Sequence, residues 1–339
     1  MRITQKLLQA YKLRIKRKRL LWRAIRSRRA LTAVAVRTGK IARDDILLFA
    51  TMRNEAQRIP HFLKHYRALG VRHFLIVAND CTDQTVDLLQ GQPDVSLWIT
   101  QNSYRDARFG MDWTNWLLTR YGAGHWCVTV DADELLVYPH SDTRPLNELT
   151  QWLSAKGAPS MGAIMLDLYP EGPLSEATVD DDPTRALPFF DSLGYIWEYQ
   201  PRFENISIRG GPRRRSFFVK TPERAPHLHK IPLVAWKRGY VYVSSMHVAL
   251  PRRLNHAFDA RLELPTGVLL HSKFLDGAIA RAAEEKARGE HFTHKEHYDG
   301  YYDQIARDPT LKTKKSRRFE GPSSLIQAGL MVSGDWHRD

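Results

Sequence analysis

Apolar residues form short runs separated by polar clusters in the first third of the chain. Residues 46–50 and 74–78 are continuous apolar stretches of strand length, and apolar residues at helical spacing between them end at Gly70. This pattern predicts a buried strand, an amphipathic helix and a second buried strand. A further helix is expected to begin near Thr82 or Asp83, since either side chain can cap a helix. Strands that alternate with helices indicate a parallel sheet with right-handed crossovers.

A third apolar run, Val128-Thr129-Val130, leads into two carboxylates, Asp131 and Asp133, which we call the acidic pair. Residues i and i+2 of a strand project to the same side, so both carboxylates can converge on one cation. Their oxygens suit Mg²⁺ or Mn²⁺, and such an ion can neutralise a departing diphosphate. A polar strand end with acidic turn residues would give the same pattern, so the pair alone does not decide.

The polar clusters that follow the three apolar runs are ordered along the chain. They read Arg-Asn-Glu-Ala from residue 53, Asn-Asp-Cys-Thr-Asp-Gln-Thr from residue 79, and Val-Asp-Ala-Asp-Glu from residue 130. Ligands of parallel sheets bind at the carboxyl ends of the strands, where all three clusters fall. In this order the clusters resemble the nucleotide-sugar-binding half of family 2-type glycosyltransferases with the GT-A fold, over about residues 45–139.

The resemblance implies a GT-A-like α/β fold, with a mostly parallel sheet flanked by helices, and a nucleoside diphosphate sugar as the donor. It also implies Mn²⁺ or Mg²⁺ as cofactor, with the acidic pair at the metal and the sugar. By the same resemblance, the residues that line the nucleotide pocket or contact base and ribose are Thr51, Arg53, Asn54, Glu55, Asn79 and Asp83. One position departs from the family, because many relatives carry two adjacent acids where this chain has Ala78-Asn79.

Basic segments add candidates for binding the diphosphate. In the resembling family, the helix before the acidic pair approaches the donor, which suggests roles for Arg105, Arg108 and Asn115; a solvated helix face is the alternative. Later, two glycines precede three arginines at 213–215. Glycines permit close backbone approach to a ligand, and the planar guanidinium pairs with two phosphate oxygens, so Arg213 and Arg215 are candidates. An exposed basic turn would look the same.

Two histidines and one acid complete the candidate site. His271 lies in a Leu-Leu-His-Ser-Lys-Phe segment that resembles the histidine element of GT-A enzymes, which implies a metal ligand; His247 is the alternative. A histidine after an apolar run can equally be structural. Asp191 is the first choice as catalytic base, because its aromatic neighbours would raise the basicity of its carboxylate. Glu223 and Glu198 are the reserves, and Asp191 could instead cap a helix.

The net charge of +14 is concentrated at the N-terminus. Residues 1–43 contain fifteen Lys or Arg and no acid, which leaves 36 basic and 37 acidic residues in 44–339. The arm has apolar residues at helical spacing, so it could lie on an anionic membrane surface. A solvated tail and nonspecific RNA binding are the alternatives. The apolar runs are shorter than the roughly 20 residues that a bilayer crossing requires.

These observations predict a basic amphipathic arm (1–43), a GT-A-like domain (44–275) and a helical C-terminal extension (276–339). Two cysteines build no disulfide framework, which favours a reducing compartment. We therefore expect a cytoplasmic enzyme, peripheral on the inner membrane face, that adds sugars to a glycan or lipid-linked acceptor in bacterial surface glycan synthesis, with inversion. His291, His294 and His297 recur at three-residue spacing, which favours a solvated helix over a metal site.

Two other classes remain open. Phosphatases of the haloacid dehalogenase type also carry Asp-x-Asp after an apolar strand, but they place it at the first strand and follow it with Thr or Val where this chain has Leu135. A noncatalytic nucleic-acid-binding protein would use the basic arm. The nearly neutral charge of residues 44–339 argues against that class.

Overall fold

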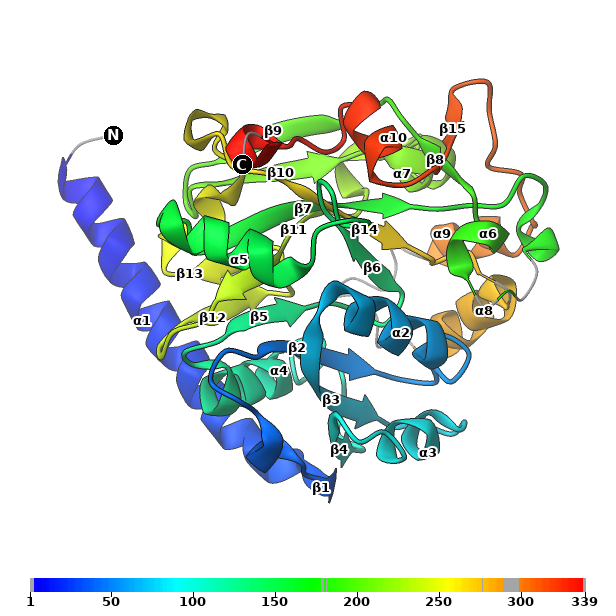
Figure 1. Cartoon of the computed structure of the whole chain (residues 1–339). Helices are drawn as coiled ribbons and strands as arrows, with labels where there is room; N and C mark the ends of the chain where they lie inside the picture. The colour runs from blue at the N-terminus through cyan, green and yellow to red at the C-terminus, as the bar shows by residue number, and fades with distance from the viewer. Residues whose placement is uncertain (1–2, 178–179, 181, 276, 289–298, 338–339) are drawn as a thin grey trace.

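A nine-stranded sheet with strand order β1-β4-β3-β2-β5-β11-β7-β14-β6 forms the centre of the molecule (Figure 1). The computed structural model describes residues 3–177, 180, 182–275, 277–288 and 299–337. His291, His294 and His297 lie outside this range. The strands of the sheet are β1 (Thr32–Ala35), β2 (Ile46–Met52), β3 (Val71–Asn79), β4 (Val95–Thr100), β5 (Trp126–Thr129), β6 (Glu134–Val137), β7 (Ser160–Asp167), β11 (His229–Ala235) and β14 (Gly267–His271).

The other elements are helices and short two-stranded pairs. The helices are α1 (Ile3–Ser27), α2 (Ile59–Leu69), α3 (Thr85–Gln90), α4 (Met111–Leu117), α5 (Leu146–Ala155), α6 (Pro183–Ala186), α7 (Gly211–Phe217), α8 (Ala278–Arg288), α9 (Asp299–Ile305) and α10 (Pro322–Gln327). The remaining strands are β8 (Phe189–Asp191), β9 (Ile196–Gln200), β10 (Asn205–Arg209), β12 (Val241–Ser244), β13 (Val248–Leu250) and β15 (Ser316–Arg318). They pair as β8 with β15, β9 with β10 and β12 with β13.

The predicted α/β class is confirmed as a large mixed, mostly parallel sheet flanked by helices. Strands β2, β3, β4, β5, β7 and β14 run in one direction, whereas β1, β11 and β6 run in the other. The arrangement is compatible with a Rossmann-like fold. Because the six co-directional strands end at the same edge, their carboxyl ends bring together residues that are far apart in the sequence.

The two continuous apolar runs that were predicted to be strands lie in β2 and β3. Both β2 and β3 are buried along nearly their whole length, because α2 and α5 cover one face of the sheet while α4 and β12 cover the other (Figure 1). Helix α2 buries one face, as predicted, and ends at Gly70, whose φ of 100° is readily adopted only by glycine. Helix α3 begins at Thr85, later than expected. Asp83 still accepts a hydrogen bond from the Thr85 amide at 2.9 Å.

The basic arm that the sequence predicted as a separate unit up to residue 43 is built into the fold. Helix α1 packs against α4 and β12, and it buries Leu13, Leu20 and Ala24. Strand β1 extends the sheet by pairing with β4. Residues 3–43 are therefore not a solvated tail. None of the described helices has an apolar run long enough to cross a bilayer.

The C-terminal extension contains helices, as predicted, together with one strand. β15 pairs with β8, and the buried Trp336 packs edge-on against Trp152 of α5 with ring centroids 5.8 Å apart. Helices α8 and α9 lie near the carboxyl ends of the central strands, and both contribute side chains to the cleft described next.

Candidate active site

A cleft of about 1020 Å³ lies along the carboxyl edge of the sheet. Its walls include the polar segment after β2, the end of β3, the acidic pair after β5, and His271 at the end of β14. Of the candidates from the sequence, the cleft is lined by Thr51, Arg53, Asn54, Glu55, Asn79, Arg105, Arg108, Asp131, Asp133, Arg213, Glu223, His247 and His271. The parallel direction of these strands explains why local sequence signals far apart in the chain meet here.

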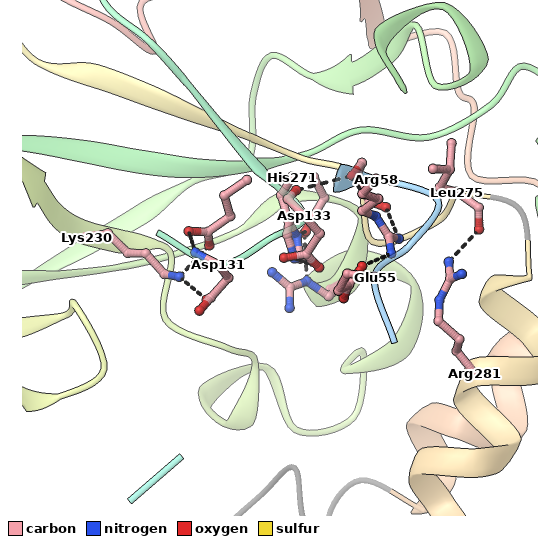
Figure 2. Close-up of polar contacts among 12 residues, drawn as sticks. Glu55, Arg58, Asp131, Asp133, Lys230, His271, Leu275 and Arg281 are labelled. Atoms are coloured by element: carbon pink, nitrogen blue, oxygen red, sulfur yellow. Dashed lines mark hydrogen bonds and ion pairs between the residues drawn. The ribbon is translucent and has the colours of Figure 1, made fainter. Parts of the chain in front are cut away.

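Asp131 is held by a buried lysine. Lys230 of β11 lies 2.7 Å from an Asp131 carboxylate oxygen and also pairs with Glu134, and its side chain is 3 % exposed (Figure 2). Burial lowers the pKa of Lys230, but the attraction of Asp131 and Glu134 outweighs it and raises the pKa above the ordinary value. Lys230 is thus a fixed cation at the floor of the cleft.

Replacing Lys230 with methionine should cost about 3–5 kcal/mol of unfolding free energy, because it leaves the fully buried Glu134 carboxylate without its cation. Denaturant unfolding of the variant measures this. Lys156→Met is the control, since Lys156 makes an exposed ion pair with Asp335 whose loss should change the free energy by about 1 kcal/mol or less. Equal stability of the two variants would contradict the assignment.

Asp133 begins a chain of charged contacts that crosses the sheet edge. Its carboxylate lies 3.1 Å from Nε2 of His271, and Nδ1 of His271 lies 2.6 Å from Asp167. Arg213 Nε donates to the other Asp167 oxygen at 2.7 Å. Burial would raise the pKa of Asp133, but His271 and Arg58 hold it well below the usual range. The carboxylate is therefore ionised and held in a defined position.

On the other side of Asp133 lies a second ion pair (Figure 2). Arg58, at the start of α2, contacts Glu55 at 2.6 Å and donates to the Ser272 carbonyl at 3.1 Å. The Ser272 amide in turn donates to the Asp133 carbonyl at 2.8 Å. Burial raises the pKa of Glu55, opposed by Arg58. The pair thus connects the segment after β2 to the segment after β14, next to the acidic pair.

The expected Mn²⁺ or Mg²⁺ requires oxygen or nitrogen atoms of several side chains close together in the cleft. Asp133 and His271 lie 3.1 Å apart as an ion pair, so a divalent cation would take the place of the proton between them once His271 is neutral. Asp167 on Nδ1 is the type of partner that orients a metal-binding histidine. Asp131 is engaged by Lys230, and in the part of the chain described here no three His, Cys, Asp or Glu side chains converge on one point. Asp133 and His271 are thus the two described side chains that could hold a divalent cation, and the cation itself stays a prediction.

Several donor-binding candidates instead make structural contacts. Asn115 is buried, and its amide exchanges hydrogen bonds with the Tyr242 backbone at 2.9 and 3.0 Å, so it holds α4 to β12. Asp83 does not line the cleft; it accepts from the Thr85 and Ala56 amides. Asn54 pairs with Thr82 across the two loops, yet it lines the cleft as expected. The structure therefore does not bring Asn115 and Asp83 into the cleft with the other candidates.

Asp191 and Arg215 form a partly buried ion pair, and the structure places neither of them in the cleft lining. Arg215 Nε lies 2.7 Å from one Asp191 oxygen, and Tyr169 donates to the other at 2.6 Å. The aromatic neighbours bury Asp191 as expected, but its partners engage both carboxylate oxygens. In this structure Asp191 therefore makes structural contacts in the β8 region and does not meet the other candidates.

The charged contacts around the acidic pair include Arg58, Asp167 and Lys230, which the sequence did not identify as candidates. Asp167 carried a usable signal, because it ends the apolar run of β7 in the same way that the acidic pair follows β5. Lys230 lies within an apolar strand, where a lone lysine marks a paired charge. His247 lines the cleft, and burial holds its pKa well below the ordinary value, so it is neutral.

The cleft carries more basic than acidic side chains. Its cations are Arg53, Arg58, Arg105, Arg108, Arg209, Arg213, Arg224, Lys230, Lys273 and Arg281, and its acids are Glu55, Asp106, Asp131, Asp133, Glu223 and Glu284. Such a surplus suits an anionic ligand. Comparisons with protein-family models and with curated proteins found no match for this chain.

Proposed function

We propose that this protein is a glycosyltransferase that moves a sugar from a nucleoside diphosphate sugar to an acceptor hydroxyl. The observation that carries the proposal is the acidic pair at the carboxyl end of β5, inside a large cleft with a surplus of cations. Asp133 is ionised and oriented by His271, and arginines from several elements line the same cleft. This arrangement suits a ligand that combines a diphosphate with a polar sugar.

The cations would bind the donor diphosphate and stabilise its charge as the sugar departs. Arg213 is anchored by Asp167 and Arg58 by Glu55, so neither must reorganise during the reaction. When bound through Asp133 and His271, Mn²⁺ or Mg²⁺ supplies further neutralisation of the diphosphate. Lys230 holds the Asp131 carboxylate in place beside this site.

Calorimetric titration of the full chain with uridine, guanosine and thymidine diphosphate sugars tests donor binding. We expect one nucleotide class to bind, with affinity that falls when a chelator removes the divalent cation. Equal affinity with and without chelator would show that donor binding needs no divalent cation. If none of the nucleotide sugars binds, the proposed donor class is contradicted.

We assign the catalytic base to Glu223, which the sequence offered as an alternative to Asp191. Among the described residues beyond the acidic pair, Glu223 and Glu284 are the acids that line the cleft, and Glu284 is paired with Arg53 at 2.8 Å. Glu223 lies 4.0 Å from Arg224, a longer contact, and its side chain is 69 % exposed, so an acceptor hydroxyl can reach it. Glu198 does not line the cleft. A single displacement with Glu223 as base would invert the anomeric carbon.

Glu223→Gln should reduce turnover by about 10² or more while donor affinity is retained, because the amide keeps the shape and removes the proton acceptor. Steady-state kinetics and donor titration measure the two effects. Glu198→Gln is the matched control and should leave both unchanged. If Glu223→Gln turns over within a few-fold of the unsubstituted protein, the base is another group.

A further inference from the structure

Helix α1 has two different faces. The inner face carries Leu13, Leu20 and Ala24, all buried, and packs onto α4 and β12. The outer face exposes large apolar side chains at helical spacing: Leu8 (54 % exposed), Tyr11 (62 %), Ile15 (49 %) and Trp22 (58 %). With 3.6 residues per turn, these four form one stripe on the side of the helix opposite the buried residues. We call it the outer stripe.

The outer stripe is flanked by cations. Exposed basic residues on either side of it are Lys12, Arg14, Lys18, Arg19 and Arg26, and residues 1–43 contain no Asp or Glu. The Arg26 guanidinium lies 5.4 Å from the centre of the Trp22 ring. Figure 1 shows α1 along one edge of the molecule, with its outer side uncovered by other elements. A contiguous apolar stripe that the fold leaves in water marks an interaction surface.

We propose that the outer stripe of α1 binds an anionic membrane surface. A helix with basic flanks and an apolar face that includes Trp and Tyr suits the boundary between headgroups and acyl chains. Nucleic acid would satisfy the cations but leave the apolar stripe exposed. A second copy of the chain would bring two strongly basic helices together. Charge and apolar character together therefore select an anionic bilayer.

The docked helix would also set the orientation of the cleft. Arg23 of α1 lies 2.7 Å from Asp112, whose other oxygen lies 3.0 Å from Arg108, and Arg108 lines the cleft. Because the inner face of α1 packs onto the rest of the protein, the orientation of the helix relative to the cleft is fixed. A bilayer under the outer stripe would hold the cleft at one angle to the membrane, whatever reaction the cleft performs.

Sedimentation with lipid vesicles tests the proposal without donor or acceptor. The full chain should bind vesicles that contain phosphatidylglycerol at least tenfold more tightly than vesicles of phosphatidylcholine alone. Substitution of Leu8, Tyr11, Ile15 and Trp22 by serine should weaken this binding tenfold or more. The thermal unfolding transition should be preserved, because these side chains are already exposed.

The control variant removes exposed apolar side chains elsewhere: Leu193, Trp197 and Tyr199, replaced by serine at and before β9. It should sediment like the unsubstituted protein. Equal sedimentation of the outer-stripe variant and the full chain would overturn the proposal. So would loss of binding in the control variant, or binding of single-stranded RNA without binding of anionic vesicles.

Discussion

Replacement of Asp133 by asparagine is expected to reduce sugar transfer by at least about 10²–10³, the usual loss when a group that stabilises developing charge is removed. Asn keeps the size of the side chain and its contact with His271 but carries no negative charge. The donor set facing His271 would lose its anion, and the divalent cation would lose a ligand. Turnover and donor affinity in the presence of Mn²⁺ measure the effect.

The matched control is Asp87→Asn, on the exposed face of α3 and outside the cleft lining. It should transfer sugar at the normal rate. A circular dichroism melt of each variant separates loss of chemistry from loss of fold. If folded Asp133→Asn transfers sugar at close to the normal rate, the acidic pair is not part of the reaction.

The second large effect concerns the N-terminal segment. A chain that begins at Asp44 should fail to give a cooperative unfolding transition, because it loses α1 and the edge strand β1 together. The loss exposes the cluster of Val241, Val243 and Leu250, which Leu13 and Leu20 cover. It also removes Arg23 from Asp112, whose side chain is 4 % exposed. Thermal unfolding followed by circular dichroism measures the outcome.

Two single substitutions test the packing of α1 without changing its net charge. Leu20→Ala should lower the unfolding free energy by about 2–5 kcal/mol, because Leu20 is buried against the body. Leu8→Ala should change it by about 0.5 kcal/mol or less, since Leu8 is exposed on the outer stripe. If the shortened chain melts cooperatively at the normal temperature, α1 is an appendage and not part of the fold.

Local pattern predicted the framework because the central strands are covered on both faces. Continuous apolar runs are then required, and they are visible in β2 and β3 without knowledge of the neighbours. The acidic pair was also a local signal, two residues apart at a strand end. By contrast, Lys230 meets Asp131 only because β11 inserts between β5 and β7, a long-range pairing that no local pattern encodes.

The candidates that lie away from the cleft or make structural contacts share a cause, since residue type does not fix the direction of a side chain. Asp191 and Arg215 were expected in the cleft but neutralise each other. Asn115 has an amide that suits a ligand, yet it pairs with the Tyr242 backbone. In α1 the helical spacing identified the apolar residues, but those of the outer stripe are exposed, and Leu13, Leu20 and Ala24 make the buried contacts.

Measurement of product formation from a nucleoside diphosphate sugar would test the proposed sugar transfer itself. The full chain would be incubated with each donor of the panel and Mn²⁺, and release of nucleoside diphosphate would be measured with Asp133→Asn in parallel. We expect nucleoside diphosphate to be released from one class of donor. Its release should rise when an acceptor hydroxyl is supplied and should be absent with Asp133→Asn. Release from no donor, or equal release by Asp133→Asn, would contradict the proposed transfer.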